Sequence, residues 1–310
     1  MKIVTSNFNL DQIATSGQCF RWCRIKDESI SGICSESGID DIYEDTICYA
    51  IPAYGYTLIA LQKENNIYFS CNETAWNEIW SDYFDIKRDY GAIGNKIMSS
   101  KDSHLKECFV HGSGIRILKQ DLNEVIFSFM ISQNNNIKRI SGSIEAICAK
   151  FGQFTKCYDI AMPAKSDSYD YGYEMLVYLL NKKYGNSFYI FPNFEDMPEN
   201  LFDNISPGLG YREEYLMNLR LLLINHPDLL DELKRMNYKD AVTELMKIKG
   251  IGAKVANCIA LFGLSFVEAF PIDTHMKQIM IEYYPKGIDL RPYADEAGII
   301  QQYLFYHSLR

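Results

Sequence analysis

The spacing of apolar residues changes character about a third of the way along the chain. Before that point, short segments rich in isoleucine, tyrosine and cysteine are separated by glycine, asparagine, aspartate and serine, which is typical of strands. We expect these segments to form an antiparallel sheet, with a helix near residues 74–84. They are SISGICS (29–35), DIYEDTICYAI (41–51), YTLIALQ (56–62) and NIYFSC (66–71).

From about residue 120, apolar residues recur at intervals of three and four, the period of helices that bury one face. The clearest examples are NEVIFSFMIS (123–132), ISGSIEAICAKF (140–151), EEYLMNLRLLLINH (213–226), YKDAVTELMKI (238–248), KVANCIALFGL (254–264) and AGIIQQYLFYHSL (297–309). The pattern predicts an α+β protein. An N-terminal α/β domain with an antiparallel sheet spans residues 1–119, and an all-helical domain spans residues 120–310. We interpret residues 163–186, which surround a short helical segment, LVYLLNKK (176–183), as an insertion whose overall structure we leave unassigned.

The charge balance limits the kinds of partner. The 310 residues include 40 acidic and 31 basic side chains, a net charge of −9. That excludes a partner held by bulk positive charge, but a basic groove on an acidic protein still accommodates nucleic acid. Residues 1–100 carry −6 of the total, whereas residues 235–280 carry six basic and four acidic side chains, a local charge of +2.

Cysteine usage and hydropathy indicate the compartment. The nine cysteines are odd in number and include no C-x-x-C pair, so we expect reduced thiols rather than disulfides or a zinc framework. No cysteine follows Cys258, which excludes a four-cysteine iron-sulfur loop there. We expect no signal peptide, because the first dozen residues lack an apolar stretch, and the longest apolar stretch, residues 258–272, is too short to span a membrane. We expect a monomeric cytoplasmic protein, nucleoid-associated if bacterial, with no membrane partner.

The segment IKGIGAK, between two predicted helices, offers the strongest chemical signal. Gly250 and Gly252 permit a sharp turn that directs backbone N–H groups toward a phosphate at the start of the second helix. Lys254 follows at once, and Asp273 lies in FPIDTHM. A desolvated lysine amine is a carbon nucleophile, and a carboxylate stabilises positive charge developing on a sugar. Each feature also has an ordinary explanation: a turn, a solvated lysine and a helix N-cap.

Five blocks in order along the chain resemble one family. They are SGQCFRW (16–22), GIRILKQDLNEVIFSFMISQNNNIKRISG (114–142), LGYREEY (209–215), GIGAKVANCI with VEAFPIDTHM (250–276), and AGIIQQYLF (297–305). Together they resemble the 8-oxoguanine DNA glycosylase/lyases of the helix-hairpin-helix (HhH-GPD) superfamily. The resemblance implies a TBP-like N-terminal sheet domain, a helical HhH-GPD domain with its hairpin at about 246–254, and base-excision repair of damaged double-stranded DNA.

The resemblance also implies roles for individual residues. Lys254 and Asp273 match the catalytic pair that releases the base and cleaves the strand through a lysine Schiff base. Residues matching the base pocket are Gly17, Cys258, Gln301 and Phe305. Among the residues matching DNA contacts, Tyr211 corresponds to an aromatic wedge beside the lesion, Asn134 to the side chain that fills the vacated space, and Arg139 and Arg212 to contacts with the orphaned cytosine. Gly250, Gly252 and His275 match phosphate contacts. Carbonyls of Met246, Ile248 and Ile251 are expected to hold a structural Na⁺, K⁺ or Ca²⁺ ion, with no catalytic cofactor.

Three positions depart from the family pattern: Lys249 replaces a common proline, Asn257 replaces an aspartate, and Ile300 replaces an aromatic residue. Two alternatives remain. One is excision of oxidised pyrimidines or alkylated purines on the same fold, against which SGQCFRW and Gln301 argue. The other is a non-catalytic DNA-binding module in which Lys254 is only a phosphate contact, against which Asp273 and the pocket residues argue.

Overall fold

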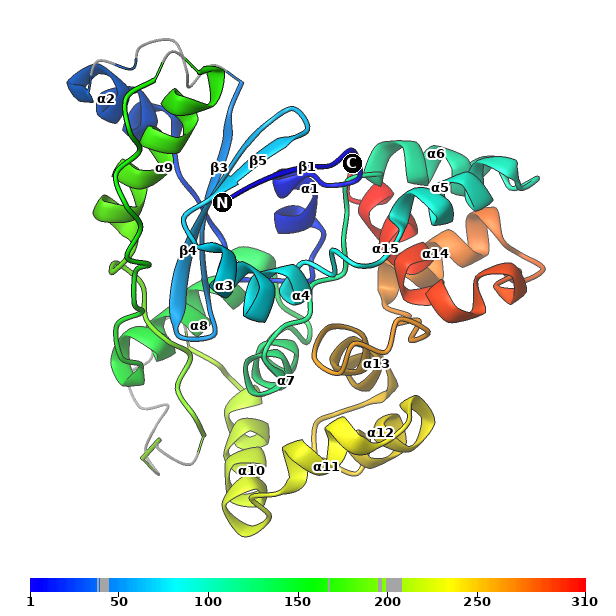
Figure 1. Cartoon of the computed structure of the whole chain (residues 1–310). Coiled ribbons are helices and arrows are strands. Elements are labelled where there is room, and N and C mark those ends of the chain that lie inside the picture. The colour runs from blue at the N-terminus through cyan, green and yellow to red at the C-terminus, as the bar shows by residue number, and fades with distance from the viewer. Residues whose placement is uncertain (38, 40–44, 167, 195–196, 199–207) are drawn as a thin grey trace.

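The computed structural model describes residues 1–37, 39, 45–166, 168–194, 197–198 and 208–310. Within these residues, one antiparallel sheet has the strand order β1-β5-β4-β3-β2, and helices surround it and continue into a separate helical part (Figure 1). The strands are β1 (Lys2–Val4), β2 (Cys23–Arg24), β3 (Ile47–Ala53), β4 (Tyr56–Lys63) and β5 (Asn66–Phe69). The α+β prediction is therefore confirmed.

Both faces of the sheet are buried. Neighbouring residues of a strand point to opposite faces, so one strand contributes to the apolar core on each side. On β3, Cys48 and Ala50 belong to one apolar cluster, and Tyr49 and Ile51 belong to another. The first cluster includes residues of α2 (Asp27–Ser37) and α9 (Tyr169–Tyr184). The second is completed by α1 (Leu10–Thr15) and the helical segment α3 (Glu73–Ala75), η1 (Trp76–Trp80) and α4 (Ser81–Tyr83). The expected helix near residues 74–84 is thus present, with a π-helical turn at its centre.

The strand predicted at residues 29–35 is wrong: these residues form the middle of α2. Ile30, Ile33 and Cys34 are the buried residues of this helix, and their spacing of three and four matches one helical face. Asp27 and Glu28 occupy its first turn, where acidic side chains favour a helix. The β-branched composition of the segment had masked its helical period. Part of another predicted strand, residues 41–44, lies outside the described residues.

Residues 163–186, left without assigned structure, include α9, which packs on β4 and β5 from the helical half of the sequence. Lys2 Nζ pairs with Asp170 Oδ1 at 2.7 Å, and Tyr68 stacks on Tyr173 with ring centroids 5.1 Å apart. In Figure 1, α9 runs along the side of the sheet next to α2. The insertion therefore completes the core of the sheet region.

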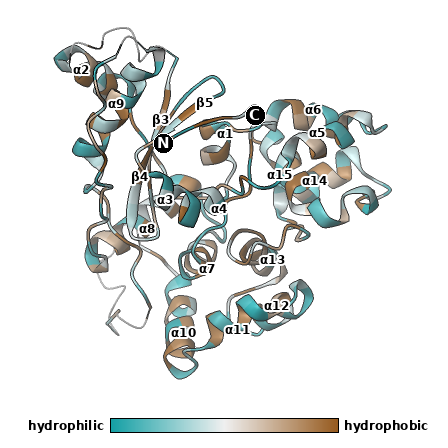
Figure 2. Ribbon diagram, in the orientation of Figure 1, coloured by the Kyte–Doolittle hydropathy of each residue, from teal (hydrophilic) through white to brown (hydrophobic). Residues whose placement is uncertain are grey.

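The remaining helices form a second core. They are α5 (Tyr90–Ser99), α6 (Ser103–Gly112), α7 (Leu122–Ile131), α8 (Ile137–Phe151), α10 (Arg212–Asn225), α11 (Leu229–Arg235), α12 (Tyr238–Leu245), α13 (Ala253–Phe262), α14 (Thr274–Tyr283), the 3-10 helix η2 (Arg291–Glu296) and α15 (Ala297–His307). Strongly apolar α7 and α13 lie together in this part (Figure 2). No helix in the described part of the chain is long and apolar enough to cross a membrane.

The packing of α5 and α6 bears on the domain boundary. Both precede residue 119, yet their buried residues belong to the same cluster as those of α13 and α15. α6 packs against α15 at the C-terminal end of the chain. The boundary between residues 119 and 120 stays a prediction, and the apolar packing groups α5 and α6 with the helical part.

Candidate active site

The turn between α12 and α13 depends on its first glycine. Gly250 has φ +92°, and a Cβ placed on it would lie 2.5 Å from Cγ of Tyr215. Gly252 is the N-cap of α13 with φ −91°, and no described atom lies within 4 Å of its would-be Cβ. The first N–H groups of a helix have no partner within the helix. This hairpin therefore presents backbone donors beside an open surface.

Lys254 occupies the first turn of α13 and faces apolar neighbours. Its Nζ lies 5.4 Å from the ring centroid of Phe129 on α7. Burial raises the pKa of the Cys258 thiol to about 11, and the charge and hydrogen bond of Lys254 counteract that rise. The lysine amine and the thiol, one helical turn apart, thus face the same space. Lys254 lies at the start of the helix that follows the hairpin, as the sequence predicted.

Asp273 is the N-cap of α14, where its Oδ1 accepts a hydrogen bond from the backbone N–H of Met276 at 2.8 Å. The ordinary explanation for this aspartate is therefore correct. It does not exclude a second role, because a carboxylate offers another oxygen. Capping fixes the side chain of Asp273 at the wall that it shares with Lys254.

Two cavities meet at Lys254 and Asp273, which line both. The outer one has a volume of about 460 Å³ and opens to the surface. It is lined by Ser132, Gln133, Asn134, Asn135, Gly252, Val255, Ile272, Thr274, His275 and Lys277 in addition to the shared pair. The inner one measures about 40 Å³ and is lined by Gly17, Phe129, Cys258, Phe262, Pro271, Gln301, Gln302 and Phe305. The structure thus joins an open cleft to a narrow pocket through the two predicted catalytic residues.

Phe305 narrows the inner pocket next to Gly17. Gly17 has φ +76°, and a Cβ on it would lie 3.0 Å from Cε1 of Phe305. A volume of about 40 Å³ holds a few water molecules and no bicyclic ring. A flat ring therefore enters only if Phe305 moves away from Gly17. The glycine keeps its place because Gln18 donates to the carbonyl of Arg116 at 2.9 Å and accepts from the N–H of Leu118 at 2.8 Å.

Two buried glutamines border this pocket. Gln302 Nε2 donates to Gln301 Oε1 at 3.0 Å, and Gln302 Oε1 is buried without a hydrogen-bond partner among the described residues. Buried polar atoms are normally paired, so unmet hydrogen-bonding capacity beside a cavity is consistent with a polar ligand. Gln301 was expected here. Gln302 was missed, although a second polar residue in an otherwise apolar helix face was a usable signal.

A loop after α7 approaches the hairpin from the other side. Gln133 donates from Nε2 to the carbonyl of Gly250 at 3.0 Å. Asn134, exposed with φ +46°, donates to the hydroxyl of Tyr211 at 3.3 Å, and half of the Tyr211 side chain is exposed. Asn134 lines the outer cleft and is hydrogen-bonded to Tyr211, so the two residues lie together; their entry into a helical stack stays a prediction. Gln133, which joins loop and hairpin, was missed by the sequence analysis.

The two arginines expected to contact the orphaned base differ in exposure. Arg139, at the start of α8, is exposed and donates to the carbonyl of Gly208 at 3.0 Å. Arg212 is buried and donates to the carbonyls of Gln133, Asn134 and Leu209. In this structure Arg212 supports the loop from within, and a DNA contact through its bonded nitrogens requires these bonds to break.

His275 and the expected cation site lie at the same surface. His275 is exposed next to Asp273, and its ring lies 5.8 Å from that of Phe305. Of the three carbonyls expected to hold a cation, Ile248 accepts the N–H of Ile251 at 3.0 Å. No donor among the described residues bonds the carbonyls of Met246 and Ile251. These oxygens fit a hard cation, whose ligands are oxygen atoms.

Comparisons with known proteins agree with this arrangement. Residues 1–126 match the model of the 8-oxoguanine DNA glycosylase N-terminal domain. The N-glycosylase/DNA lyase OGG1 of Arabidopsis thaliana is 25% identical over 296 residues, covering 91% of this chain and 68% of the relative. A probable N-glycosylase/DNA lyase of Methanothermobacter thermautotrophicus is 28% identical over 257 residues, 73% of each chain.

A solved structure is similar over the whole length. The 8-oxoguanine glycosylase/lyase of Clostridium acetobutylicum, crystallised with double-stranded DNA containing cytosine opposite 8-oxoguanine, superposes with a TM-score of 0.75. It is 27% identical, and the match covers 100% of this chain and 97% of that one. The similarity to this structure therefore extends over the sheet, the hairpin and the Lys254–Asp273 pair. Residues 1–126 thus match the N-terminal domain of 8-oxoguanine DNA glycosylases, and the whole chain is similar to proteins named N-glycosylase/DNA lyase and 8-oxoguanine glycosylase/lyase.

Proposed function

We propose that this protein extrudes 8-oxoguanine, opposite cytosine, from double-stranded DNA, removes it, and cleaves the strand. The single observation that carries the proposal is the meeting of two cavities at Lys254 and Asp273. The outer cleft takes the DNA backbone, and the inner pocket takes the extruded base. An enzyme acting on a base within a duplex has to rotate that nucleotide out of the stack.

Lys254 is the nucleophile of this reaction. Its neutral amine attacks C1′ of the damaged nucleotide, and the bond between C1′ and the base breaks with its electron pair leaving on the base. Loss of a proton from the amine and opening of the sugar ring produce a Schiff base. Elimination then removes a proton from C2′ and breaks the bond between C3′ and the 3′ phosphate. Asp273 faces the positive charge that develops on the sugar and stabilises it.

Recognition of the damaged base rests on one hydrogen. 8-Oxoguanine carries a hydrogen on N7, which guanine lacks. No donor among the described residues bonds the carbonyl of Gly17, so it is available to accept that hydrogen. Discrimination follows because bound guanine leaves this acceptor unpaired. Gln301 reads the opposite edge of the base, and Cys258 and Phe305 enclose its two faces.

The surface residues hold the remaining duplex. Tyr211, which is hydrogen-bonded to Asn134, acts as an aromatic wedge beside the lesion, and Asn134 fills the space that the nucleotide leaves. Arg139 binds the orphaned cytosine through its planar donors. The N–H groups beside Gly252 and the side chain of His275 bind phosphates. The carbonyls of Met246, Ile248 and Ile251 would hold a structural Na⁺, K⁺ or Ca²⁺ ion, which would supply positive charge to a neighbouring phosphate. We expect a monomer that acts in the cytoplasm, on the nucleoid in a bacterium.

The test compares the wild type with Lys254→Gln on duplexes containing 8-oxoguanine, an oxidised pyrimidine, an alkylated purine or no lesion. The wild type is expected to cleave at 8-oxoguanine opposite cytosine and to yield a borohydride-trapped complex, and the variant to do neither. Lys277→Gln, which alters another lysine of the outer cleft, is the control and keeps the trapped complex. A borohydride-trapped complex formed by Lys254→Gln would refute the assignment of Lys254 as the nucleophile. Binding without cleavage by the wild type would favour the non-catalytic module.

A further inference from the structure

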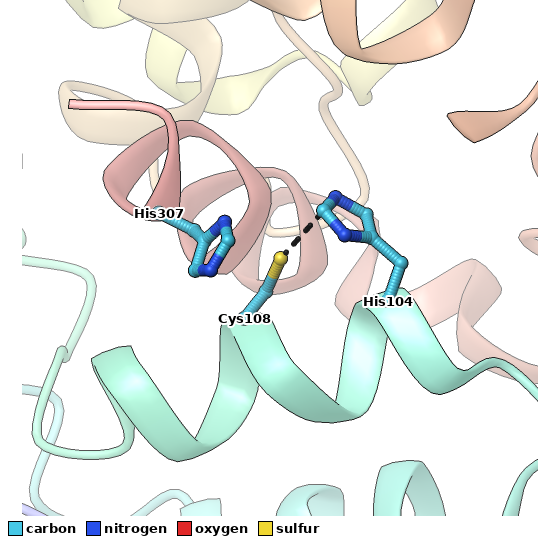
Figure 3. Close-up of side chains that lie close together, drawn as sticks. All are labelled: His104, Cys108 and His307. Carbon is cyan, nitrogen blue, oxygen red and sulfur yellow. Dashed lines mark hydrogen bonds between the residues drawn. The ribbon is translucent and has the colours of Figure 1, made fainter. Parts of the chain in front are cut away.

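Three side chains with metal-binding atoms meet where α6 packs against the end of α15. His104 and Cys108 are four residues apart on α6, so they share one helical face. His307 is the last residue of α15. The sulfur of Cys108 lies between the two imidazole rings (Figure 3). None of the three residues lines either cavity of the active site.

The distances within this cluster approach those of a tetrahedral site. One ligand atom from each residue lies within 4.8 Å of the other two. Cys108 Sγ and His104 Nε2 are 3.5 Å apart. Zinc bond lengths of about 2.3 Å to sulfur and about 2.0 Å to nitrogen place these two ligand types roughly 3.5 Å apart in a tetrahedron. The separation of Cys108 Sγ and His104 Nε2 thus already suits a tetrahedral zinc site. Moving the ring of His307 by roughly 1 Å brings its ligand nitrogen to a similar distance from both.

The hydrogen bonds of the cluster are incomplete. Nε2 of His307 is buried and has no hydrogen-bond partner among the described residues. Glu107 Oε1 lies 3.4 Å from it, close enough for an ion pair but outside hydrogen-bonding geometry. A buried imidazole nitrogen without a partner costs free energy, which a metal ion would recover. Glu107 is exposed and reaches the cluster from the solvent side.

We propose that His104, Cys108 and His307 bind one Zn²⁺ ion, with water or the Glu107 carboxylate as the fourth ligand. Thiolate and imidazole donors favour zinc over magnesium and calcium, which prefer oxygen. The bond between zinc and sulfur forms as the thiol of Cys108 releases its proton to solvent. Cys108 is fully buried, whereas His104 is partly exposed, so the ion enters past His104.

The ion would be structural, because it joins two helices at a distance from Lys254. α15 also carries Gln301 and Phe305, which line the inner pocket. His307 follows Phe305 by two residues, so a zinc bond to His307 anchors the C-terminal end of this helix to α6. The ion thereby holds the pocket-bearing helix in place without taking part in the reaction.

The test is a Co²⁺ titration of the metal-stripped full-length protein, followed by Zn²⁺ displacement. One equivalent of Co²⁺ is expected to produce a thiolate-to-cobalt charge-transfer band, and Zn²⁺ is expected to abolish that band and raise the Tm. Cys108→Ala and His104→Gln are each expected to weaken binding at least ~100-fold, since altering outer-shell partners alone costs 10–100-fold. Circular dichroism checks that each variant is folded.

Two matched controls separate this site from chance metal binding. Cys23→Ser removes an exposed cysteine, and His111→Gln removes a histidine of α6 whose ring lies 5.8 Å from that of His307. Both are expected to keep the charge-transfer band and the Tm increase. A wild type without a thiolate band, or unchanged binding in the folded cluster variants, overturns the proposal. Because no readout uses DNA, failure here is distinct from failure of the glycosylase assignment.

Discussion

Replacing Gly250 by alanine is expected to destabilise the hairpin, whereas replacing Gly252 is expected to weaken DNA binding alone. At Gly250 the backbone has φ +92°, a conformation that costs an alanine about 1–2 kcal/mol. The new Cβ would also lie 2.5 Å from Cγ of Tyr215, well inside van der Waals contact. Tyr215 packs against the helical core, so relieving this overlap costs about 1–3 kcal/mol more.

The two costs together lower the free energy of unfolding by about 2–5 kcal/mol. At Gly252 the backbone is ordinary and the added methyl group meets no described atom, so Gly252→Ala loses at most about 1 kcal/mol, the cost of a weaker N-cap. That methyl group lies where a phosphate would approach the first amides of α13. Gly252→Ala is therefore expected to bind a lesion-containing duplex about 10-fold less tightly, the equivalent of about one hydrogen bond.

Urea unfolding of the full-length protein measures the first effect, and fluorescence anisotropy with a labelled duplex measures the second. Gly250→Ala is expected to lower the Tm by roughly 3–8 °C, given the entropy of unfolding of a chain of this size. Equal stability losses in the two variants, or unchanged affinity in Gly252→Ala, would refute the assignment of one glycine to the turn and the other to the phosphate.

Three further outcomes are expected. Arg21→Ala removes a buried guanidinium that bonds Glu124 Oε2 at 3.1 Å, and unfolding in urea should show a loss of about 3–5 kcal/mol, against about 0–1 kcal/mol for the exposed Lys234→Ala. Arg139→Ala is expected to lose the preference for cytosine over adenine opposite the lesion in cleavage assays, and an unchanged preference contradicts its role. Because two of the six basic residues in 235–280 are paired with glutamates, the slope of log affinity against log salt should be shallower than that of a protein with ~6–10 phosphate contacts.

The elements with a strong period were predictable from the sequence. β4 and β5 begin at residues 56 and 66, as expected from YTLIALQ and NIYFSC. α7, α8, α10, α12, α13 and α15 lie where apolar residues recur at three and four. The α2 segment shows the limit of this reasoning: isoleucine-rich composition favoured a strand, and the positions of Ile30, Ile33 and Cys34 made a helix. Packing of these three residues against α9 and the sheet stabilises the helix.

Contacts between distant segments were not predictable from local pattern. α9 lies about 100 residues after β5 in sequence, yet it completes the same core. α5 and α6 pack with α15 at the other end of the chain. A short segment specifies which of its faces is apolar but not which partner buries that face, because several apolar faces are chemically equivalent. Loop lengths and side-chain volumes across the whole molecule select the pairing.

In the candidate site, too, some features were predictable from the sequence and others depend on the fold. Hydrophobic pattern and turn chemistry predicted the fold class and the turn glycine of the hairpin, and the family resemblance indicated Lys254 and Asp273. The folded chain shows that these two residues line both cavities and that Phe305 lies beside Gly17 in the inner pocket. It also shows that Arg212 bonds inward while Arg139 is exposed. Residue type sets the chemistry that is available to a side chain. Segments remote in sequence contribute its burial and its hydrogen-bond partners, and these determine which role it can take.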